Sequence, residues 1–401
     1  MKFLQETRLP PSSDGLVEVR ALYERADGRT IPFLFAIPGA LCDAMTKRTD
    51  HWFVLGVTAA FAANEDYEHK GAVCSVLRRN MVSLTRQWGQ FFPGRRVIDV
   101  QIDGDLVEPS ADQEERGVAC LYTGGVDSSF TMCRIGGRVS TLLSARFAFD
   151  DRVLDVYRRE PVAQSSEAFK GKEHLLIATN LVRPFAEFGD AWSYLTHGPA
   201  LISIAHMFAP KVSRVVVSSS HAYGQLLPWG SHPLTDPLLS SASVEVEHYG
   251  ATYSRFEKVL AIAQDNEAVA QLVVCGKPFD QKQGLLNCSE CQKCLRTMVA
   301  LDLANVDKSQ CRSFEWSGFS AQRIAGMTLY HRNEVLFMEE LLEAAQQLGR
   351  EDITEPVKLV LARSSRYKVL AATEGMVRRR FPTIVAKVGG LRKIKRFVVR
   401  T

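Results

Sequence analysis

The chain has 401 residues, of which 46% are hydrophobic and 23% are charged, and its formal net charge is +4. This composition excludes a disordered chain and is sufficient for two or three globular domains. Nine Lys or Arg and no acidic residue lie in 376–401, which leaves 40 basic and 45 acidic residues in the rest of the chain. A uniformly basic surface of the kind that coats nucleic acid is therefore excluded for the body of the chain.

The N-terminal residues 1–7 contain no apolar signal core, and the longest apolar run, 52–63, is too short to cross a bilayer. The nine cysteines are an odd number, and three of them lie within seven residues. This pattern favours metal binding in a reducing compartment over a disulfide framework. We therefore expect a cytoplasmic protein.

Residues 1–115 are expected to form an α+β N-terminal domain. Two apolar runs, 16–23 and 31–37, flank an Asp27-Gly28 turn, which predicts a β-hairpin. The acidic segment 103–115 is interpreted as a linker. The other elements predicted in this part are helices at 50–64 and 76–92 and a strand at 96–102.

From residue 116 the pattern changes to apolar runs that alternate with helical segments, which is typical of a parallel α/β sheet. This second domain is expected to span 116–312, and a mostly helical C-terminal extension with a basic tail to span 313–401. In the second domain the predicted strands are 117–122, 140–143, 174–180 and 214–220, with a strand end near 271–274. The predicted helices of this domain include 194–208 and 295–301. In the C-terminal extension a helix is predicted at 334–348.

The most informative stretch is 121–130, where a buried strand runs into a glycine turn and then into a helix. Paired glycines let the backbone approach a ligand closely, and the amide groups of a helix N-terminus favour phosphate. The acidic residue in the turn is interpreted as a helix-start residue or a Mg²⁺ partner. The candidate nucleotide-binding residues are Thr123, Gly124, Gly125, Val126, Asp127, Ser128 and Ser129, of which Asp127 and Ser128 are the candidate catalytic residues.

The sequence Thr-Gly-Gly-Val-Asp-Ser at 123–128 resembles the Ser-Gly-Gly-x-Asp-Ser signature of the PP-loop ATP pyrophosphatases. The resemblance implies a parallel-sheet, HUP-like domain that cleaves ATP between its α- and β-phosphates and transfers AMP to a substrate oxygen. ATP and Mg²⁺ are the implied cofactors. The alternative is a glycine turn in an ordinary strand–turn–helix unit.

A proline-rich loop, 227–237, follows the fourth predicted strand and has no regular period. Its prolines limit its conformations, so that polar groups would be held in place at low entropic cost. Trp229, His232 and Asp236 are the candidate substrate-binding residues. The alternative is a rigid surface loop that covers the sheet edge.

A second strong signal is formed by Cys275, Cys288, Cys291 and Cys294. Two-residue spacing lets neighbouring thiolates converge on one ion, and four sulfurs suit tetrahedral Zn²⁺. We expect a structural zinc knuckle followed by a helix. An iron–sulfur cluster and free buried cysteines are the alternatives.

The glycine turn followed by four cysteines resembles the 7-cyano-7-deazaguanine synthases of queuosine-precursor synthesis over about residues 117–305. Those enzymes adenylate a carboxylate and convert it with ammonia to an amide and a nitrile. This chain has additional residues at both ends, and Pro228-Trp229-Gly230-Ser231-His232-Pro233 stands where the synthases carry Tyr-Pro-Asp. The identity of the substrate therefore does not carry over.

The expected function is that of an ATP-dependent, AMP- and pyrophosphate-forming ligase that adenylates a carboxylate or carbonyl oxygen for attack by ammonia or an amine. The alternatives are a tRNA thiolation enzyme and a non-catalytic nucleotide-binding module. The expected partners are a small-molecule substrate, a second copy in a homodimer and, through the basic tail, nucleic acid or an anionic membrane, with a solvated charged end as the alternative. Lys211, Arg183 or Arg255 could supply positive charge to the site.

Overall fold

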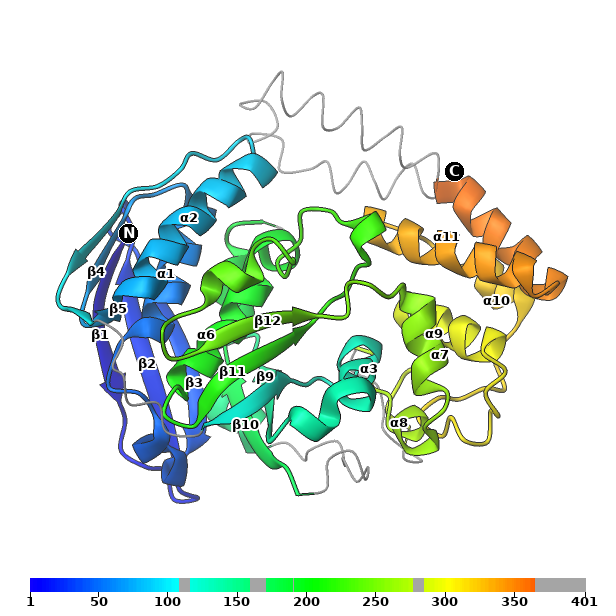
Figure 1. Ribbon diagram of the computed structural model, residues 1–401, viewed down its shortest axis with the longest axis horizontal. Coiled ribbons are helices and arrows are strands. Elements are labelled where there is room, and N and C mark those ends of the chain that lie inside the picture. The colour runs from blue at the N-terminus through cyan, green and yellow to red at the C-terminus, as the bar shows by residue number, and fades with distance from the viewer. Residues whose placement is uncertain (108–115, 159–170, 190, 277–284, 365–401) are drawn as a thin grey trace. The chain divides into compact units, whose positions relative to one another are not determined.

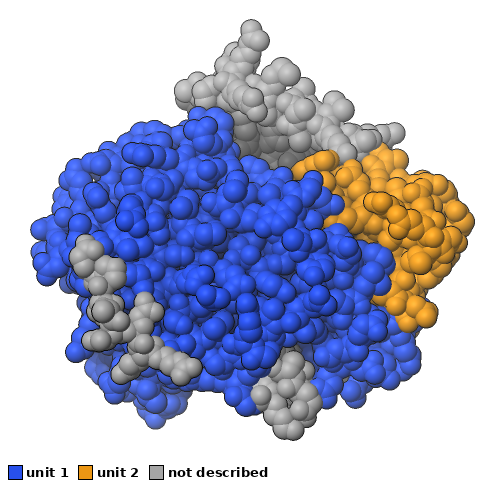
Figure 2. All heavy atoms as spheres, viewed as in Figure 1, with its two compact units in different colours: residues 1–287, 306–313 blue, residues 288–305, 314–401 orange. Residues whose placement is uncertain are grey.

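The computed structural model describes residues 1–107, 116–158, 171–189, 191–276 and 285–364. They fall into two compact units, coloured in Figure 2. The first consists of residues 1–287 and 306–313, and the second of residues 288–305 and those from 314 onward. The predicted basic tail, 376–401, and most of the predicted linker lie outside the described residues.

The described residues form a mixed, mostly parallel ten-stranded sheet, a small two-stranded sheet and flanking helices (Figure 1). The strands are β1 (Lys2–Arg8), β2 (Leu16–Glu24), β3 (Thr30–Pro38), β4 (Tyr67–Lys70), β5 (Val73–Cys74), β6 (Val100–Asp103), β7 (Leu106–Val107), β8 (Gly117–Leu121), β9 (Thr141–Phe147), β10 (Glu173–Thr179), β11 (Val212–Ser218) and β12 (Glu245–Tyr249). The helices are α1 (Asp50–Ala63), α2 (Ser75–Phe91), α3 (Val126–Ile135), α4 (Val153–Arg158), α5 (Val182–Ala186), α6 (His197–Met207), α7 (Arg255–Ile262), α8 (Asn266–Ala270), α9 (Gln292–Leu303), α10 (Ala321–Ala325) and α11 (Arg332–Gln347).

Five parallel strands form one half of the large sheet, in the spatial order β12-β11-β8-β9-β10. The first strand of this half, β8, lies in the middle, and the chain builds the sheet outward first on one side of it and then on the other. The strand order therefore reverses between β8 and β11, which is where open α/β sheets bind ligands beyond the carboxyl ends of their strands. The predicted alternation of strands and helices is confirmed over this half.

Strand β12 was not predicted, because its sequence Glu-Val-Glu-His-Tyr carries charge instead of an apolar run. It lies at the edge of the sheet, where Glu245 pairs with Arg214 at 2.7 Å and Glu247 pairs with Arg138 at 2.9 Å. An edge strand tolerates such residues because one side of it faces solvent.

The predicted hairpin is confirmed: β2 and β3 pair antiparallel from Leu16↔Pro38 to Glu24↔Thr30, and Gly28 turns with a φ of +80°. Strand β3 also pairs antiparallel with β10 through Ala36↔Ala178. The N-terminal strands therefore extend the same sheet instead of forming a second one. The three predicted domain ranges stay a prediction, because neither the sheet nor the two units measure independent folding.

Helix α1 is buried on every face, with 13 of its 14 residues inaccessible, and it packs against α6. A helix that is apolar all round belongs in a core. Trp52 and Phe53 of α1 lie against Phe35 and Tyr67 of the sheet, with ring centroids 5.3 and 6.1 Å apart. The predicted helices at 50–64 and 76–92 correspond to α1 and α2. Among the described residues, every helix is too short or too polar to traverse a bilayer.

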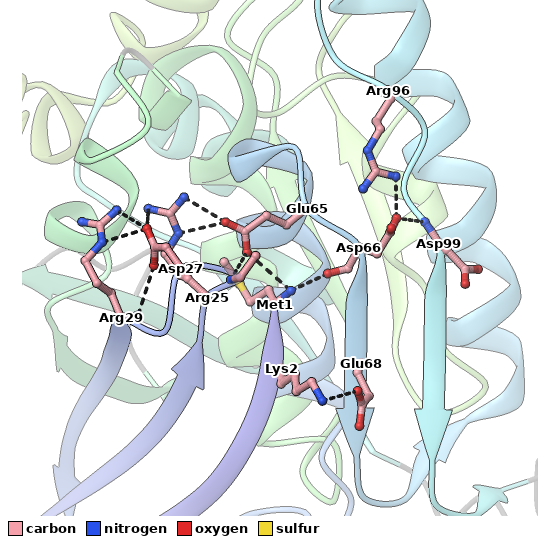
Figure 3. A network of polar contacts seen from close by, with 11 residues as sticks. Met1, Lys2, Arg25, Asp27, Arg29, Glu65, Asp66, Glu68, Arg96 and Asp99 are labelled. Atoms are coloured by element: carbon pink, nitrogen blue, oxygen red, sulfur yellow. Dashed lines mark hydrogen bonds and ion pairs between the residues drawn. The ribbon is translucent and has the colours of Figure 1, made fainter.

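Ion pairs and hydrogen bonds connect β1 with β4, and also the residues that immediately precede β4 and β6, near the far edge of the sheet (Figure 3). Most of these groups are partly exposed, so each pair contributes little stability and mainly fixes the edge. The contacts are Lys2–Glu68 at 3.0 Å, Arg25–Glu65 at 2.9 Å, Arg96–Asp66 at 2.5 Å, the Asp99 amide to Asp66 at 2.7 Å, and the Met1 amine to the Asp66 carbonyl at 2.6 Å.

The second unit contains α9, α10, α11 and a helical segment at 351–364, so the predicted C-terminal helices are confirmed over the described residues. Arg296 of α9 lies over the Phe337 ring of α11, 4.6 Å from its centroid, and Arg350 pairs with Asp302 at 2.6 Å. These contacts hold α9 against α11.

Two buried histidines in the first unit predict sensitivity to mild acid. Burial lowers the pKa of His51 and of His69 to about 3 in the folded chain. The unfolded chain takes up these protons near pH 6.5, so between the two values it binds more protons than the folded chain. The free energy of unfolding should therefore fall as the pH drops from 6.5, by up to about 1.4 kcal/mol per pH unit for each histidine. Urea unfolding between pH 7.5 and 5 measures this free energy. His51→Leu should reduce its slope against pH. Equal slopes in the two proteins would contradict the assignment.

Candidate functional site

The glycine turn between β8 and α3 brings all seven predicted nucleotide-binding residues together. Gly124 has a φ of +73°, a backbone conformation that residues other than glycine rarely adopt. The Thr123 amide donates to Ser128 Oγ at 3.3 Å, and Ser128 Oγ donates to the Gly125 carbonyl at 3.2 Å. Ser129 is as deeply buried as Ser128, and α3 begins at Val126. The turn is thus a defined loop whose hydroxyl and amide groups lie at a helix N-terminus.

Asp127, the acidic residue of the turn, is held by two basic side chains of α7. Arg255 Nη1 lies 2.7 Å from its Oδ2 and Lys258 Nζ lies 3.5 Å from its Oδ1. Burial acts to raise the pKa of Asp127, but Arg255 and Lys258 outweigh it and lower the pKa below its usual value. The carboxylate is therefore ionised at neutral pH, and the three groups together carry a net positive charge. A lone carboxylate would repel phosphate, and the two basic side chains offset that repulsion.

The carboxyl end of β11 completes the site. Ser218 Oγ lies 2.8 Å from Thr131 Oγ1 of α3, and Lys258 Nζ donates to the Ser219 carbonyl at 2.5 Å. Burial lowers the pKa of His221 to about 4, and the nearby Arg255 and Lys258 lower it as well, so its imidazole is neutral at pH 7. The turn, α7 and the β11 terminus therefore meet where the strand order reverses.

Trp229 of the proline-rich loop lies beside this cluster. The rings of Tyr194, His197 and His221 surround it edge-on, with centroid distances of 5.3 to 5.9 Å. Tyr194 belongs to a π-helical turn, Trp192–Thr196, that precedes α6, and such turns are frequent at functional sites. Since Trp229 contacts His221, the loop adjoins the glycine turn.

His232 and Asp236 lie inside the loop instead. Both are buried, and Asp236 accepts from Ser231 Oγ at 2.6 Å and from the His232 amide at 3.1 Å and lies 2.7 Å from His248 Nδ1. His232 Nδ1 accepts from the Leu234 amide at 3.0 Å. These contacts favour the alternative of a rigid loop for these two residues, whereas the ring of Trp229 contacts that of His221.

Of the three cations considered from the sequence, Arg255 alone is placed at the turn. Lys211 pairs with Glu173, and Arg183 pairs with Asp151 at 2.8 Å. Lys258 was missed, although it is almost completely buried beside Asp127. Its position three residues after Arg255 on one helix was the available signal, because that spacing places both side chains on one face.

The four predicted metal ligands are brought together. The sulfur atoms of Cys275, Cys288, Cys291 and Cys294 all lie within 4.8 Å of one another. Cys294 Sγ is 3.7 Å from Cys288 Sγ and 3.4 Å from Cys291 Sγ. A tetrahedral Zn²⁺ with Zn–S bonds of about 2.3 Å places its sulfurs about 3.8 Å apart. The four thiolates could therefore hold a metal such as zinc.

The strand end predicted at 271–274 is wrong, because residues 272–276 are irregular. Their amides bind other partners than a neighbouring strand: the Val273 amide donates to the Gly124 carbonyl at 2.8 Å, and the Val274 amide donates to Asn287 Oδ1 at 2.8 Å. Cys275 thus reaches its position from a loop that runs past the glycine turn.

Comparison of the chain with family models, with curated proteins and with solved structures finds no match.

Cys288→Ser and Cys294→Ser should each remove the bound metal, because three thiolates hold zinc far more weakly than four. Cys311→Ser is the matched control, since Cys311 is buried but lies outside the cluster, and burial raises the pKa of its thiol to about 11. Elemental analysis of the purified proteins should find about one zinc per chain in the control and less than half of that in the other two. Equal metal content in all three would contradict a metal site.

Gly124→Ala should disrupt the turn. The left-handed conformation costs about 1–2 kcal/mol for alanine, and the added methyl group would lie 3.3 Å from the Val273 side chain. Gly28→Ala, at a φ of +80° with open space around it, carries the same backbone cost and serves as the control. Thermal unfolding should show a loss of stability in both variants. Calorimetry with inorganic pyrophosphate should show weakened binding for Gly124→Ala alone. Equal pyrophosphate binding by both variants would contradict a phosphate-binding turn.

Proposed function

We propose that the chain is an ATP-dependent ligase of the PP-loop, HUP-like class that forms AMP and pyrophosphate. In this proposal the turn 123–129 binds the phosphates of ATP, and a carboxylate or carbonyl oxygen of a small molecule attacks the α-phosphate. Pyrophosphate leaves, and ammonia or an amine then displaces AMP from the adenylate. The single observation that carries the proposal is the turn with Arg255 and Lys258 behind it, at the point where the strand order reverses.

The residues of the turn have separate roles in this reaction. The backbone amides at the start of α3, with Ser128 and Ser129, bind the pyrophosphate part of ATP. Arg255 and Lys258 stabilise the negative charge that develops on the leaving pyrophosphate, and a fixed cation does so without reorganising. No side-chain nucleophile is needed, because catalysis of this kind rests on positioning and charge neutralisation.

Mg²⁺ would neutralise the phosphate oxygens when it is bound. Both carboxylate oxygens of Asp127 already contact a basic side chain, so Asp127 would hold the ion through water. The four cysteines are proposed to bind a structural zinc, since four protein thiolates would fill a tetrahedral coordination shell.

Trp229 is proposed to contact the acceptor, because its ring contacts that of His221, whereas His232 and Asp236 are engaged in hydrogen bonds within the loop. A small-molecule acceptor and a homodimer remain part of the proposal. So does contact of the basic tail with nucleic acid or an anionic membrane, although the tail lies outside the described residues.

A tRNA thiolation enzyme is the second candidate, and it requires a reactive cysteine or an iron–sulfur cluster. Burial raises the pKa of Cys120 to about 12 and that of Cys133 to about 11, so neither cysteine beside the turn is a thiolate at neutral pH. This disfavours sulfur transfer through either residue. Finding iron and labile sulfide in place of zinc would favour thiolation.

Asp127→Ala and Ser128→Ala should each lower ATP–pyrophosphate exchange at least 100-fold, because both residues shape the turn that receives the phosphates. Asp155→Ala is the control: Asp155 also lies in the first turn of a helix and pairs with an arginine, at 3.3 Å, but away from the site. Exchange is screened with a panel of carboxylates, and calorimetry measures Mg·ATP binding.

The two measurements separate the proposal from a non-catalytic module. Tight Mg·ATP binding by the wild-type chain and the loss of that binding in Ser128→Ala support the nucleotide site. Exchange that survives in both variants, or a wild-type chain that does not bind Mg·ATP, would refute the ligase.

A further inference from the structure

The segment 272–275 lies between the two functional features of the chain. The Val273 amide donates to the carbonyl of Gly124, the left-handed residue of the turn, at 2.8 Å. A methyl group placed on Gly124 would lie 3.3 Å from Val273 Cβ and Cγ2, so the side chain of Val273 packs directly on the turn. Two residues later, Cys275 contributes its sulfur to the cysteine cluster. One short segment therefore contacts the turn through its amide and the cluster through its thiol.

This segment is irregular, and Asn287 supplies the hydrogen bonds that a strand or helix would otherwise supply. Asn287 is fully buried, and its Oδ1 accepts from the amides of Val274 at 2.8 Å and Cys275 at 3.1 Å. Its Nδ2 donates to the carbonyls of Leu272 at 2.7 Å and Ser313 at 3.1 Å. A buried amide with both ends engaged fixes its neighbours, because losing it strands several polar groups away from water.

Asn287 also precedes Cys288 directly in the chain. The Asn287 side chain thus accepts from the backbone amide of one cysteine ligand, Cys275, and Asn287 is bonded directly to the next ligand, Cys288. Hydrogen bonds thus connect Cys275 through Asn287 to Val274 and Leu272, and the Val273 amide to Gly124.

We propose that Asn287 is a positioning residue that couples the cysteine cluster to the glycine turn, so that metal binding at the four thiolates orders the turn. The coupling rests on the proposed function in one respect: the ligand that occupies the turn is taken to be a nucleotide. Coupling between two sites is reciprocal, so ATP in the turn would raise the metal affinity by the same factor as metal raises the ATP affinity. The cluster then sets the phosphate affinity as well as bracing the chain.

Amide hydrogen exchange tests the coupling without any nucleotide. Removing the metal with a chelator should raise exchange at least tenfold in peptides that cover 123–129 and Val273. Exchange in the β2–β3 hairpin, 16–38, measures global unfolding in the same sample and should stay unchanged.

Three variants separate the steps of the path. Val273→Pro removes the amide group that donates to the Gly124 carbonyl but leaves the contacts of Asn287. This variant should retain the visible absorption of thiolate-bound Co²⁺. Its turn should exchange fast whether or not metal is present. Asn287→Ala should show the same fast turn and also a weakened Co²⁺ complex. Asn180→Ala is the matched control, because Asn180 is equally buried and bridges Leu34 and Pro32 through its own side chain. Its turn should keep the full response to metal.

The linkage is then measured with Mg·ATP. The affinity of the wild-type chain for Mg·ATP should be at least fivefold higher with metal than without, and this ratio should fall to about one in Val273→Pro and Asn287→Ala. If Mg·ATP does not bind at all, the proposed function fails, whereas the exchange response of the turn still decides the coupling. The coupling itself is overturned if the turn does not respond to metal in the wild-type chain, if Val273→Pro responds like the wild type, or if the hairpin exchanges as fast as the turn.

Discussion

The contact on which the site depends is that of Asp127 with Arg255 and Lys258. A partly buried carboxylate at the start of α3 would be costly alone, and the two cations of α7 offset that cost and lower its pKa. The same contact holds α7 against α3, and Lys258 extends it to β11 through the Ser219 carbonyl. The contact thus serves both the packing of the parallel half of the sheet and the charge of the turn.

Features that arise within a few consecutive residues could be predicted from the sequence. The glycine turn and the β2–β3 hairpin follow from local backbone preference, and the spacing of Cys288, Cys291 and Cys294 from their short separation; the structure places each of them as expected. Lys258 and Asn287 were missed for the opposite reason, since each acts on residues far away in the chain. The contact between Lys258 and Asp127 spans 131 positions, and a lysine in a helix is usually solvent-exposed.

The pairing of β3 with β10 illustrates the same limit. Leu34 donates to the Asn180 side chain across 146 positions, and the neighbouring strands pair through only two residues in register. Nothing in either strand specifies this partner, because both are apolar runs that could lie in any buried sheet. The sequence therefore predicted a separate α+β N-terminal domain, whereas strands β1, β2, β3, β4 and β6 of this part lie in the same ten-stranded sheet as β8–β12.

The proline-rich loop shows how a polar motif can be structural. His232 and Asp236 are the residue types that chemistry uses, yet their atoms bind Ser231, Leu234 and His248 within or beside the loop. This internal network fixes the backbone around Trp229, whose ring meets His221 at the edge of the site. In the proposed ligase, a loop held by these contacts would select an acceptor by shape, through Trp229 and its aromatic neighbours. Under the proposed function, the acceptor would thus lie between an aromatic wall on one side and a positively charged turn on the other.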